Sequence, residues 1–119
     1  MSSNGIEGLF IETHNWGKTV AFWKSLGYDV EFETDHHSGM MRHPHGGPYL
    51  FIAERPPGQV LTVQPVIAVD DAVRFTPPSA GTVVRPFEAQ HWQVLEMLLD
   101  DPDGRRLSVQ APLPAAKTR

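Results

Sequence analysis

The chain of 119 residues carries 10 Lys and Arg against 14 Asp and Glu, which gives a formal net charge of −4 with neutral histidines. This length suits one domain, and the mild acidity argues against nucleic-acid binding, which depends on a clustered basic patch. The absence of cysteine excludes disulfides, a thiolate nucleophile and cysteine-ligated metals. No apolar run has the length of a membrane span and the N-terminus lacks the pattern of a signal peptide, so we expect a cytoplasmic protein without membrane contact.

The first half of the chain predicts a strand, a helix and three further strands. Residues 8–12 are rich in strand-forming side chains, and a helical spacing of apolar residues follows at Trp16, Val20, Trp23 and Leu26. Asn15 is a suitable N-cap and Gly27 a suitable residue just beyond the C-terminus of this helix. The three strands are expected at residues 29–34, 39–43 and 48–54, with a turn between the last two.

The second half repeats this order with a weaker helix. A strand at 62–69 leads into a short helix of about one turn at 72–75, which Pro77 and Pro78 end. Three strands follow at 82–87, 92–99 and 106–110. The element order predicts an α+β fold with a single domain built from two copies of one unit, module one at about 8–56 and module two at about 62–111, before a tail at 112–119.

Alternation along four of these strands divides their side chains into two classes, because neighbouring residues of a strand point to opposite faces. One class is aliphatic throughout and should form the core: Leu9, Ile11, Leu50, Ile52, Ile67, Val69, Leu107 and Val109. The other class mixes aromatic and polar residues: Phe10, Glu12, Tyr49, Phe51, Gln64, Val66, Arg106, Ser108 and Gln110. Apolar area with a few polar groups is typical of a small-molecule pocket. A partly filled dimer interface is the alternative interpretation.

Three segments resemble a known superfamily. Residues 15–33 (NWGKTVAFWKSLGYDVEFE), 66–71 (VIAVDD) and 101–109 (DPDGRRLSV) resemble the first helix with the second strand, the fifth strand, and the last turn and strand of the vicinal oxygen chelate superfamily. That superfamily includes glyoxalase I, bleomycin-resistance proteins, fosfomycin-resistance enzymes and extradiol dioxygenases. The resemblance implies two βαβββ modules that form curved mixed sheets around a cavity.

The resemblance also implies four metal-ligand positions, which are usually His, Glu or Gln and here are Gly8, Phe51, Gln64 and Ser108. Of these, Gln64 alone is a good ligand, and a divalent ion needs several, so we predict no metal and no cofactor. A shift of the alignment by two residues would instead offer Glu12, Glu54 or His45. His36, His37, His43 and His45 are interpreted as loop histidines, with a metal role as the alternative.

Glu12 and Trp92 have more than one interpretation. Glu12 lies near the end of the first strand, where it pairs with Arg106, contacts a ligand or, with a raised pKa, acts as a general base. Trp92 begins the seventh strand, where an exposed indole would stack on a planar ligand, and a dimer contact or a core position is the alternative. We assign no catalytic residue.

The leading hypothesis is a metal-independent small-molecule-binding protein that resembles the bleomycin-resistance-type drug-sequestering proteins, with a role in antibiotic resistance. The expected ligand is aromatic, and the expected binding residues are Phe10, Glu12, Tyr49, Phe51, Gln64, Trp92, Arg106 and Ser108. The resemblance implies a homodimer. The alternative function is a divalent-metal-dependent lyase, isomerase or dioxygenase, and a third hypothesis is a regulatory subunit whose cavity faces a partner chain.

Overall fold

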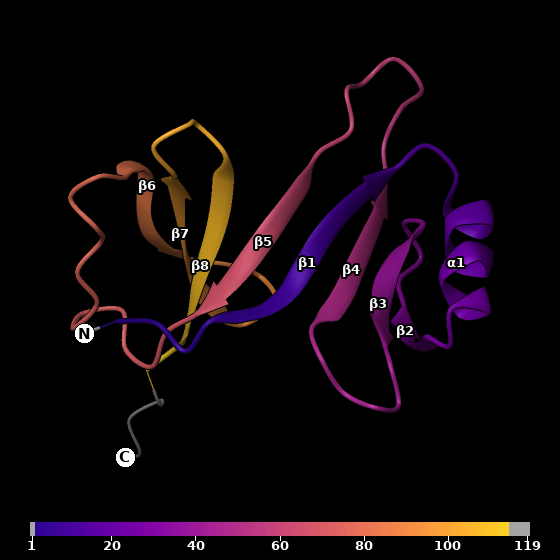
Figure 1. The fold of residues 1–119 in the computed structure, drawn as a ribbon, viewed down its shortest axis with the longest axis horizontal. Coiled ribbons are helices and arrows are strands. Elements are labelled where there is room, and N and C mark those ends of the chain that lie inside the picture. The colour runs from indigo at the N-terminus through magenta and orange to yellow at the C-terminus, as the bar shows by residue number, and fades with distance from the viewer. Residues whose placement is uncertain (1, 115–119) are drawn as a thin grey trace. The chain divides into compact units, whose positions relative to one another are not determined.

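The computed structural model describes residues 2–114, in which eight strands and one helix give an α+β fold (Figure 1). These residues form two compact units. The N-terminal unit is Glu7–Pro65, and the C-terminal unit combines the first residues through Ile6 with the chain from Val66 onward. Among the described residues, no helix has the length and apolar character that a membrane span requires.

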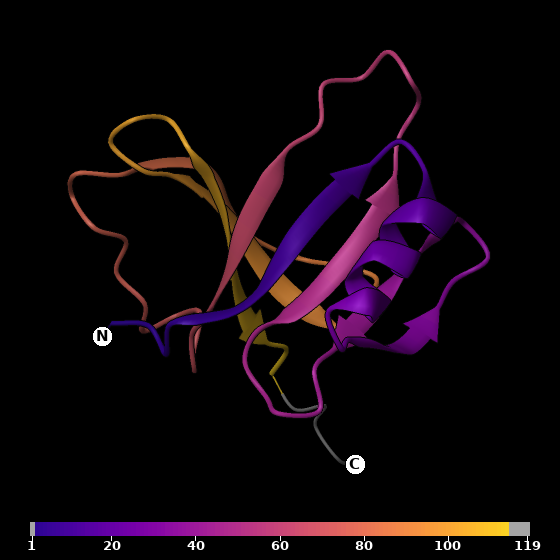
Figure 2. The same cartoon turned by 45° about the vertical axis from the view of Figure 1, so that its right-hand side comes forward.

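The N-terminal unit is a four-stranded mixed sheet with a helix on one face. Its elements are β1 (Ile6–Thr13), α1 (Trp16–Ser25), β2 (Asp29–Glu33), β3 (Ser38–Arg42) and β4 (Tyr49–Glu54). The strand order is β2-β3-β4-β1, with β1 parallel to β4 and the other neighbours antiparallel. Figure 2 shows α1 lying across the sheet over β4.

The helix begins and ends where the sequence predicts. The Asn15 side chain accepts a hydrogen bond from the Lys18 backbone N at 2.9 Å, and Leu26 is the C-cap. Gly27 follows with φ +96°, a left-handed conformation that glycine adopts without steric cost. The inner side of α1 is buried against the sheet, and this core consists of Trp16, Val20, Met41, Leu50 and Ile52. The predicted aliphatic face of β1 and β4 is therefore confirmed as core.

The C-terminal unit has the same strand order without the helix. Its strands are β5 (Val63–Ala68), β6 (Thr82–Ala89), β7 (Val94–Asp100) and β8 (Arg106–Pro112). They are ordered β5-β8-β7-β6, with β5 parallel to β8 and antiparallel pairs elsewhere. The core lies on one face and consists of Val69, Met97, Leu99, Val109 and Ala111.

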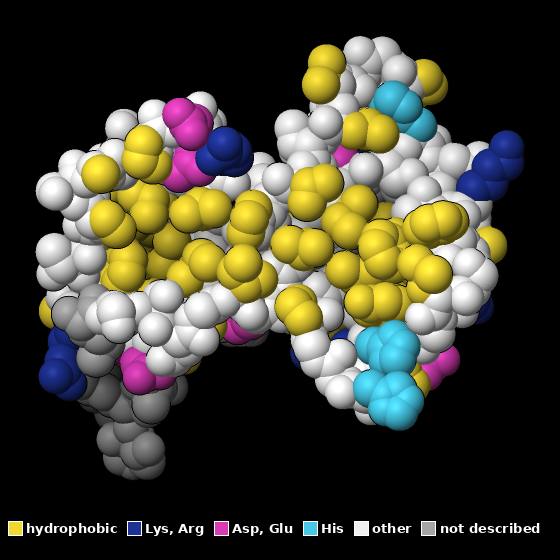
Figure 3. Space-filling model, in the orientation of Figure 1, with side chains coloured by type: hydrophobic (Ala, Val, Ile, Leu, Met, Phe, Trp, Pro, Cys, Tyr) yellow, Lys and Arg dark blue, Asp and Glu magenta, His cyan; other side chains and the backbone are white. Residues whose placement is uncertain are grey.

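The segment at 72–75, predicted as a short helix of about one turn, contains one hydrogen-bonded turn and no helix. The Phe75 N donates to the Asp71 carbonyl at 3.1 Å, and the Asp71 side chain accepts from the Val73 N at 2.9 Å. Pro77 and Pro78 follow at once, so no further helical hydrogen bond forms, and a single turn does not propagate. Partly buried side chains of loops and β6 pack against the core instead, among them Ala72, Phe75 and Phe87. Figure 3 shows hydrophobic side chains gathered over β6–β8.

Two expectations near the end of the chain also change. The seventh strand begins at Val94 rather than at Trp92, because residues 91–93 form a turn in which Gln93 has φ +69°. The last strand extends to Pro112, two residues beyond the predicted end of the strand. Residues 115–119 of the predicted tail lie outside the described residues.

Candidate functional site

Aromatic side chains cover the face of the N-terminal sheet that points away from its core. In the register of β1 and β4, Phe10 lies opposite Phe51 and Gly8 opposite Tyr49. The rings of Phe10 and Phe51 are stacked, with centroids 5.9 Å apart and planes 11° from parallel. Phe32 of β2 adds a tilted ring 6.2 Å from Phe51. We refer to Phe10, Phe32, Tyr49 and Phe51 as the aromatic wall.

Glu12 lies beside this wall and pairs with Arg55, not with Arg106. The Arg55 Nε donates to Glu12 Oε2 at 2.8 Å, and the guanidinium carbon of Arg55 lies 5.6 Å from the centre of the Phe10 ring. The proposed Glu12–Arg106 pair is therefore wrong. Arg106 instead pairs with Asp100, which is its direct neighbour across β7 and β8, with Nε 2.5 Å from Oδ1. The register of β1 with β4 brings Glu12 close to Arg55, and the register of β7 with β8 places Arg106 opposite Asp100.

The Glu12 carboxylate is almost fully engaged. Its Oε1 accepts hydrogen bonds from the backbone N and the hydroxyl of Thr62, both at 2.9 Å, and its side chain is 10 % exposed. Burial acts to raise the pKa of Glu12, but the hydrogen bonds from Arg55 and Thr62 outweigh it and hold the pKa below the ordinary value. This is the opposite of the raised pKa that a general base would have.

A second arginine stands at the other end of the wall. The guanidinium carbon of Arg42 lies 5.4 Å from the centre of the Tyr49 ring, while its Nε donates to Glu31 at 2.9 Å. The Tyr49 ring in turn lies against Gly8 and occupies the position that a Cβ of residue 8 would take. The wall is thus a set of half-exposed rings with a guanidinium group over one ring at each end.

Ser108 and Gln110 of β8 belong to a hydrogen-bonded network in the C-terminal unit, whose centre is buried. The Ser108 hydroxyl hydrogen-bonds to Glu96 Oε2 at 2.5 Å, and Gln110 Nε2 donates to the Ser108 oxygen at 2.9 Å. Arg85 Nη2 donates to both the backbone carbonyl and Oε1 of Glu96, each at 2.9 Å. Arg85 is not among the predicted binding residues; its only signal in the sequence is a lone arginine inside the predicted strand at 82–87.

The remaining predicted residues have less defined surroundings. Gln64 is half-buried in β5. Trp92 is 45 % exposed in the turn before β7, with its ring edge-on to His91 at a centroid distance of 4.9 Å. The indole is thus exposed rather than part of the core, and it lies in a turn rather than a strand; its role in binding stays a prediction. The network of Arg85, Glu96, Ser108 and Gln110 does not include Trp92.

The predicted histidine cluster divides into two places. The His43 ring lies 5.1 Å from Tyr28 and 5.4 Å from His45, and its Nδ1 accepts a hydrogen bond from the His45 N at 3.1 Å. His36 and His37 instead follow β2. Across residues 2–114, no group of three His, Asp or Glu side chains is arranged to hold a metal ion.

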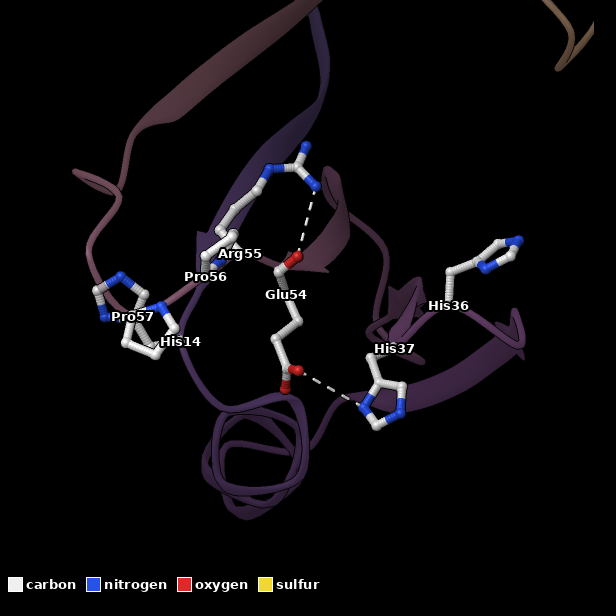
Figure 4. A pocket seen from close by; sticks show the side chains of 7 residues that line it. All are labelled: His14, His36, His37, Glu54, Arg55, Pro56 and Pro57. Carbon is white, nitrogen blue, oxygen red and sulfur yellow. Dashed lines mark hydrogen bonds and ion pairs between the residues drawn. The ribbon is translucent and has the colours of Figure 1, made fainter.

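An open depression of about 490 Å³ lies near the start of α1 and contains none of the predicted binding residues; it is lined by His14, His36, His37, Glu54, Arg55, Pro56 and Pro57 (Figure 4). Glu54 points toward His37, with Oε1 3.7 Å from Nδ1, and its Oε2 accepts from the Trp16 backbone N at 2.8 Å. This carboxylate therefore serves the first turn of the helix. His14 bonds to the Gln59 carbonyl at 2.8 Å and tethers the loop after β4.

Among solved structures, the chain is similar to a glyoxalase/bleomycin resistance protein/dioxygenase superfamily member from Vibrio splendidus 12B01, with a TM-score of 0.63 and 14% identity over 87% of this chain and 96% of that chain. The chain has the glyoxalase/bleomycin resistance/dioxygenase fold. This likeness in fold agrees with the fold that the resemblance to the vicinal oxygen chelate superfamily implies.

Two further solved structures are similar to this chain with lower TM-scores. An integron cassette protein from the mobile metagenome of the Halifax Harbour sewage outfall has a TM-score of 0.43 and 15% identity over 91% of this chain and 98% of that chain. A bleomycin resistance determinant encoded on the transposon Tn5 has a TM-score of 0.37 and 18% identity over 88% of this chain and 95% of that chain. No protein-family model and no curated protein matches the chain.

The resemblance to the vicinal oxygen chelate superfamily implies a divalent metal ion at the four positions named above, and the residues present do not fit it. Gly8 has no side chain, and the Tyr49 ring lies where one would begin. Phe51 offers a ring that is stacked on Phe10. The Ser108 hydroxyl is already bonded to Glu96 and Gln110. Gln64 is then the single donor left among the four positions, and a divalent ion needs several donors.

Proposed function

We propose that the protein binds planar aromatic small molecules without a resident metal, in the manner of a drug-sequestering protein. The single observation that carries the proposal is the near-parallel stack of Phe10 and Phe51, half-exposed on the non-core face of the N-terminal sheet. Rings on a core-free face are costly to leave in water, and an aromatic ligand covers them with both apolar contact and stacking.

The surroundings of the wall support a binding role over a catalytic one. Glu12 and Arg55 neutralise each other, and the carboxylate of Glu12 has its hydrogen bonds filled by Arg55 and Thr62. Arg42 and Arg55 each keep guanidinium N–H groups besides the Nε that contacts a glutamate, and these can orient a polar substituent of the ligand. Nothing in this arrangement is an activated nucleophile or a base.

The wider parts of the hypothesis stay predictions from the sequence. These are the homodimer, the cytoplasmic location, the role in antibiotic resistance, and the binding contributions of Gln64, Trp92, Arg106 and Ser108. The absence of suitable donors at Gly8 and Phe51 supports the metal-independent form of the proposal.

The proposal is tested by NMR titration with naphthalene-2-carboxamide, a neutral planar probe. We expect saturable shifts of the ring protons of Phe10 and Phe51, because a stacked ligand changes the ring-current field at both residues. Phe22 lies exposed on α1 outside the wall and provides the internal control. The proposal is wrong if the probe shifts Phe22 as strongly as Phe51, or if the shifts do not saturate.

A further inference from the structure

A chain of four hydrogen-bonded side chains crosses β6, β7 and β8 on the face opposite the C-terminal core; in order, it consists of Arg85, Glu96, Ser108 and Gln110. Glu96 and Ser108 are 9 % and 3 % exposed. Buried polar groups of this kind cost free energy unless they are paired, so the order of donors and acceptors along the chain is strongly constrained.

The direction of the hydrogen bonds follows from the ion pair at one end. Glu96 contacts the Arg85 guanidinium at 2.9 Å and is therefore a carboxylate, which only accepts hydrogen bonds. The Ser108 hydroxyl must then donate to Glu96 and accept from its other neighbour. That neighbour is Gln110, whose amide NH₂ donates to Ser108 at 2.9 Å. Reversing this order would require a protonated Glu96 beside Arg85.

Because the Gln110 amide nitrogen faces Ser108, its side-chain carbonyl oxygen points away from the hydrogen-bonded network. Gln110 is half-buried, whereas Ser108 behind it is buried. Within residues 2–114, the Gln110 side chain makes its hydrogen bond through Nε2 alone. The amide cannot flip to exchange its donor and acceptor without breaking the bond to Ser108. Gln110 therefore presents a fixed hydrogen-bond acceptor at the edge of a buried network.

We propose that Gln110 is a specificity-determining residue, which selects ligands with an N–H donor, such as amidines and amides, over ligands with a carboxylate. This inference rests on the proposed function in one respect, namely that the protein binds small molecules. The selection assigned to Gln110 arises from hydrogen-bond polarity, because its amide is uncharged. Arg85 pairs with Glu96 at 2.9 Å and faces Glu88 at 3.8 Å, so any effect of this local charge is independent of Gln110. Ser108 is a positioning residue that holds the amide of Gln110 in one orientation.

The test compares benzamidine with benzoate, which have the same ring and a similar shape but opposite hydrogen-bond polarity and opposite charge, and Gln110→Leu separates these two differences. The readout is the side-chain amide signal of Gln110 in a ¹⁵N-labelled sample, assigned from its loss in Gln110→Leu. We expect saturable shifts with benzamidine and an affinity about tenfold higher than that of benzoate. Equal shifts with the two compounds, or no saturable shift with benzamidine, would overturn the inference.

Variants separate hydrogen bonding from the overall charge. Gln110→Leu keeps the net charge of −4, so any preference due to the field of the protein persists, while the part due to Gln110 disappears. Ser108→Ala should lower the preference for benzamidine by freeing the amide to rotate, and Ser108→Thr, which keeps the hydroxyl, should restore it. A purely structural role of Ser108 would lower the affinity for both compounds equally.

Failure of this inference and failure of the proposed function have different outcomes. If naphthalene-2-carboxamide still shifts Phe10 and Phe51 while Gln110→Leu leaves the preference for benzamidine unchanged, the inference about Gln110 is wrong and the binding function stands. If neither naphthalene-2-carboxamide nor benzamidine gives saturable shifts in the protein, both are wrong.

Discussion

The ring of Tyr49 occupies the space in which a side chain of Gly8 would begin, so the two residues depend on each other. They lie opposite each other in the parallel pair of β1 and β4. In the superfamily that the sequence resembles, position 8 is a metal-ligand position. Here the position is a glycine, and an aromatic ring of the neighbouring strand takes the room. The Tyr49 ring therefore leaves no room for a metal-ligating side chain at position 8.

Gly8→Ala should therefore destabilise the N-terminal unit by displacing Tyr49. An added methyl group in a filled site costs about 1–3 kcal/mol, and we expect the free energy of unfolding from urea titration to fall by that amount. Gly58→Ala is the matched control, because a Cβ at that loop position meets no atom within 4 Å. In a Tyr49→Ala background the effect of Gly8→Ala should vanish. An equal cost in both backgrounds would contradict the relationship.

Glu12→Gln should destabilise the protein at neutral pH and lose this effect in acid. The pKa of Glu12 is lower in the folded protein than its ordinary value of 4.5, so the ionised carboxylate contributes stability above that value and loses it as the pH falls through the folded pKa. Loss of the charged hydrogen bonds should cost about 2 kcal/mol at pH 7.

The measurement is the difference in free energy of unfolding between the natural protein and Glu12→Gln, taken from pH 7 to pH 3. We expect the difference to be constant at neutral pH and to shrink below pH 4.5. A difference that grows as the pH falls would contradict the assigned ion pair with Arg55.

Divalent metals should neither bind stoichiometrically nor stabilise the fold. Ligand binding to the native state raises the melting temperature, so a resident metal would be evident as a shift on addition of Zn²⁺, Ni²⁺ or Mn²⁺ and a reverse shift with a chelator. We expect no such shift, because Gly8 and Phe51 offer no donor and Ser108 is already hydrogen-bonded. A one-to-one metal content in the purified protein would instead favour the metal-dependent enzyme.

Local signals in the sequence predict most of the fold. The spacing of Trp16, Val20 and Trp23, with Asn15 before them and Gly27 after, predicts α1 almost to the residue. Alternation along the strands predicts which side chains join the two cores, as Ile52 and Val109 show. These features depend on backbone periodicity and on capping, both of which are local properties. The turn at 72–75 shows the limit, because so short a segment has no periodicity to distinguish a helix from a turn.

Partners within the candidate site could be predicted less well, because they depend on loop positions and strand register. Arg55 follows directly after β4, and only the parallel pairing of β1 and β4 brings it to Glu12. Arg106 appeared equally suitable in the sequence, yet its register places it against Asp100. The ion pair of Arg85 with Glu96 fixes the direction of the hydrogen bonds that lead to Gln110. The alternation of residues around Arg85 does not predict this partner. Charge pairing across strands is a tertiary property that alternation does not encode.

The central claim, that the stacked wall of Phe10 and Phe51 binds planar aromatic ligands, is tested most directly by the effect of Phe51→Leu on ring selectivity. Calorimetry would compare naphthalene-2-carboxamide with its saturated decahydro analogue, which has the same substituent but no planar ring. Leucine keeps apolar contact and removes stacking, and Phe22→Leu makes the same change on the exposed side of α1.

We predict that the natural protein and Phe22→Leu prefer the planar compound by about tenfold, and that Phe51→Leu reduces this preference to about twofold or less. The same preference in all three proteins, or no preference in the natural protein, would contradict the account.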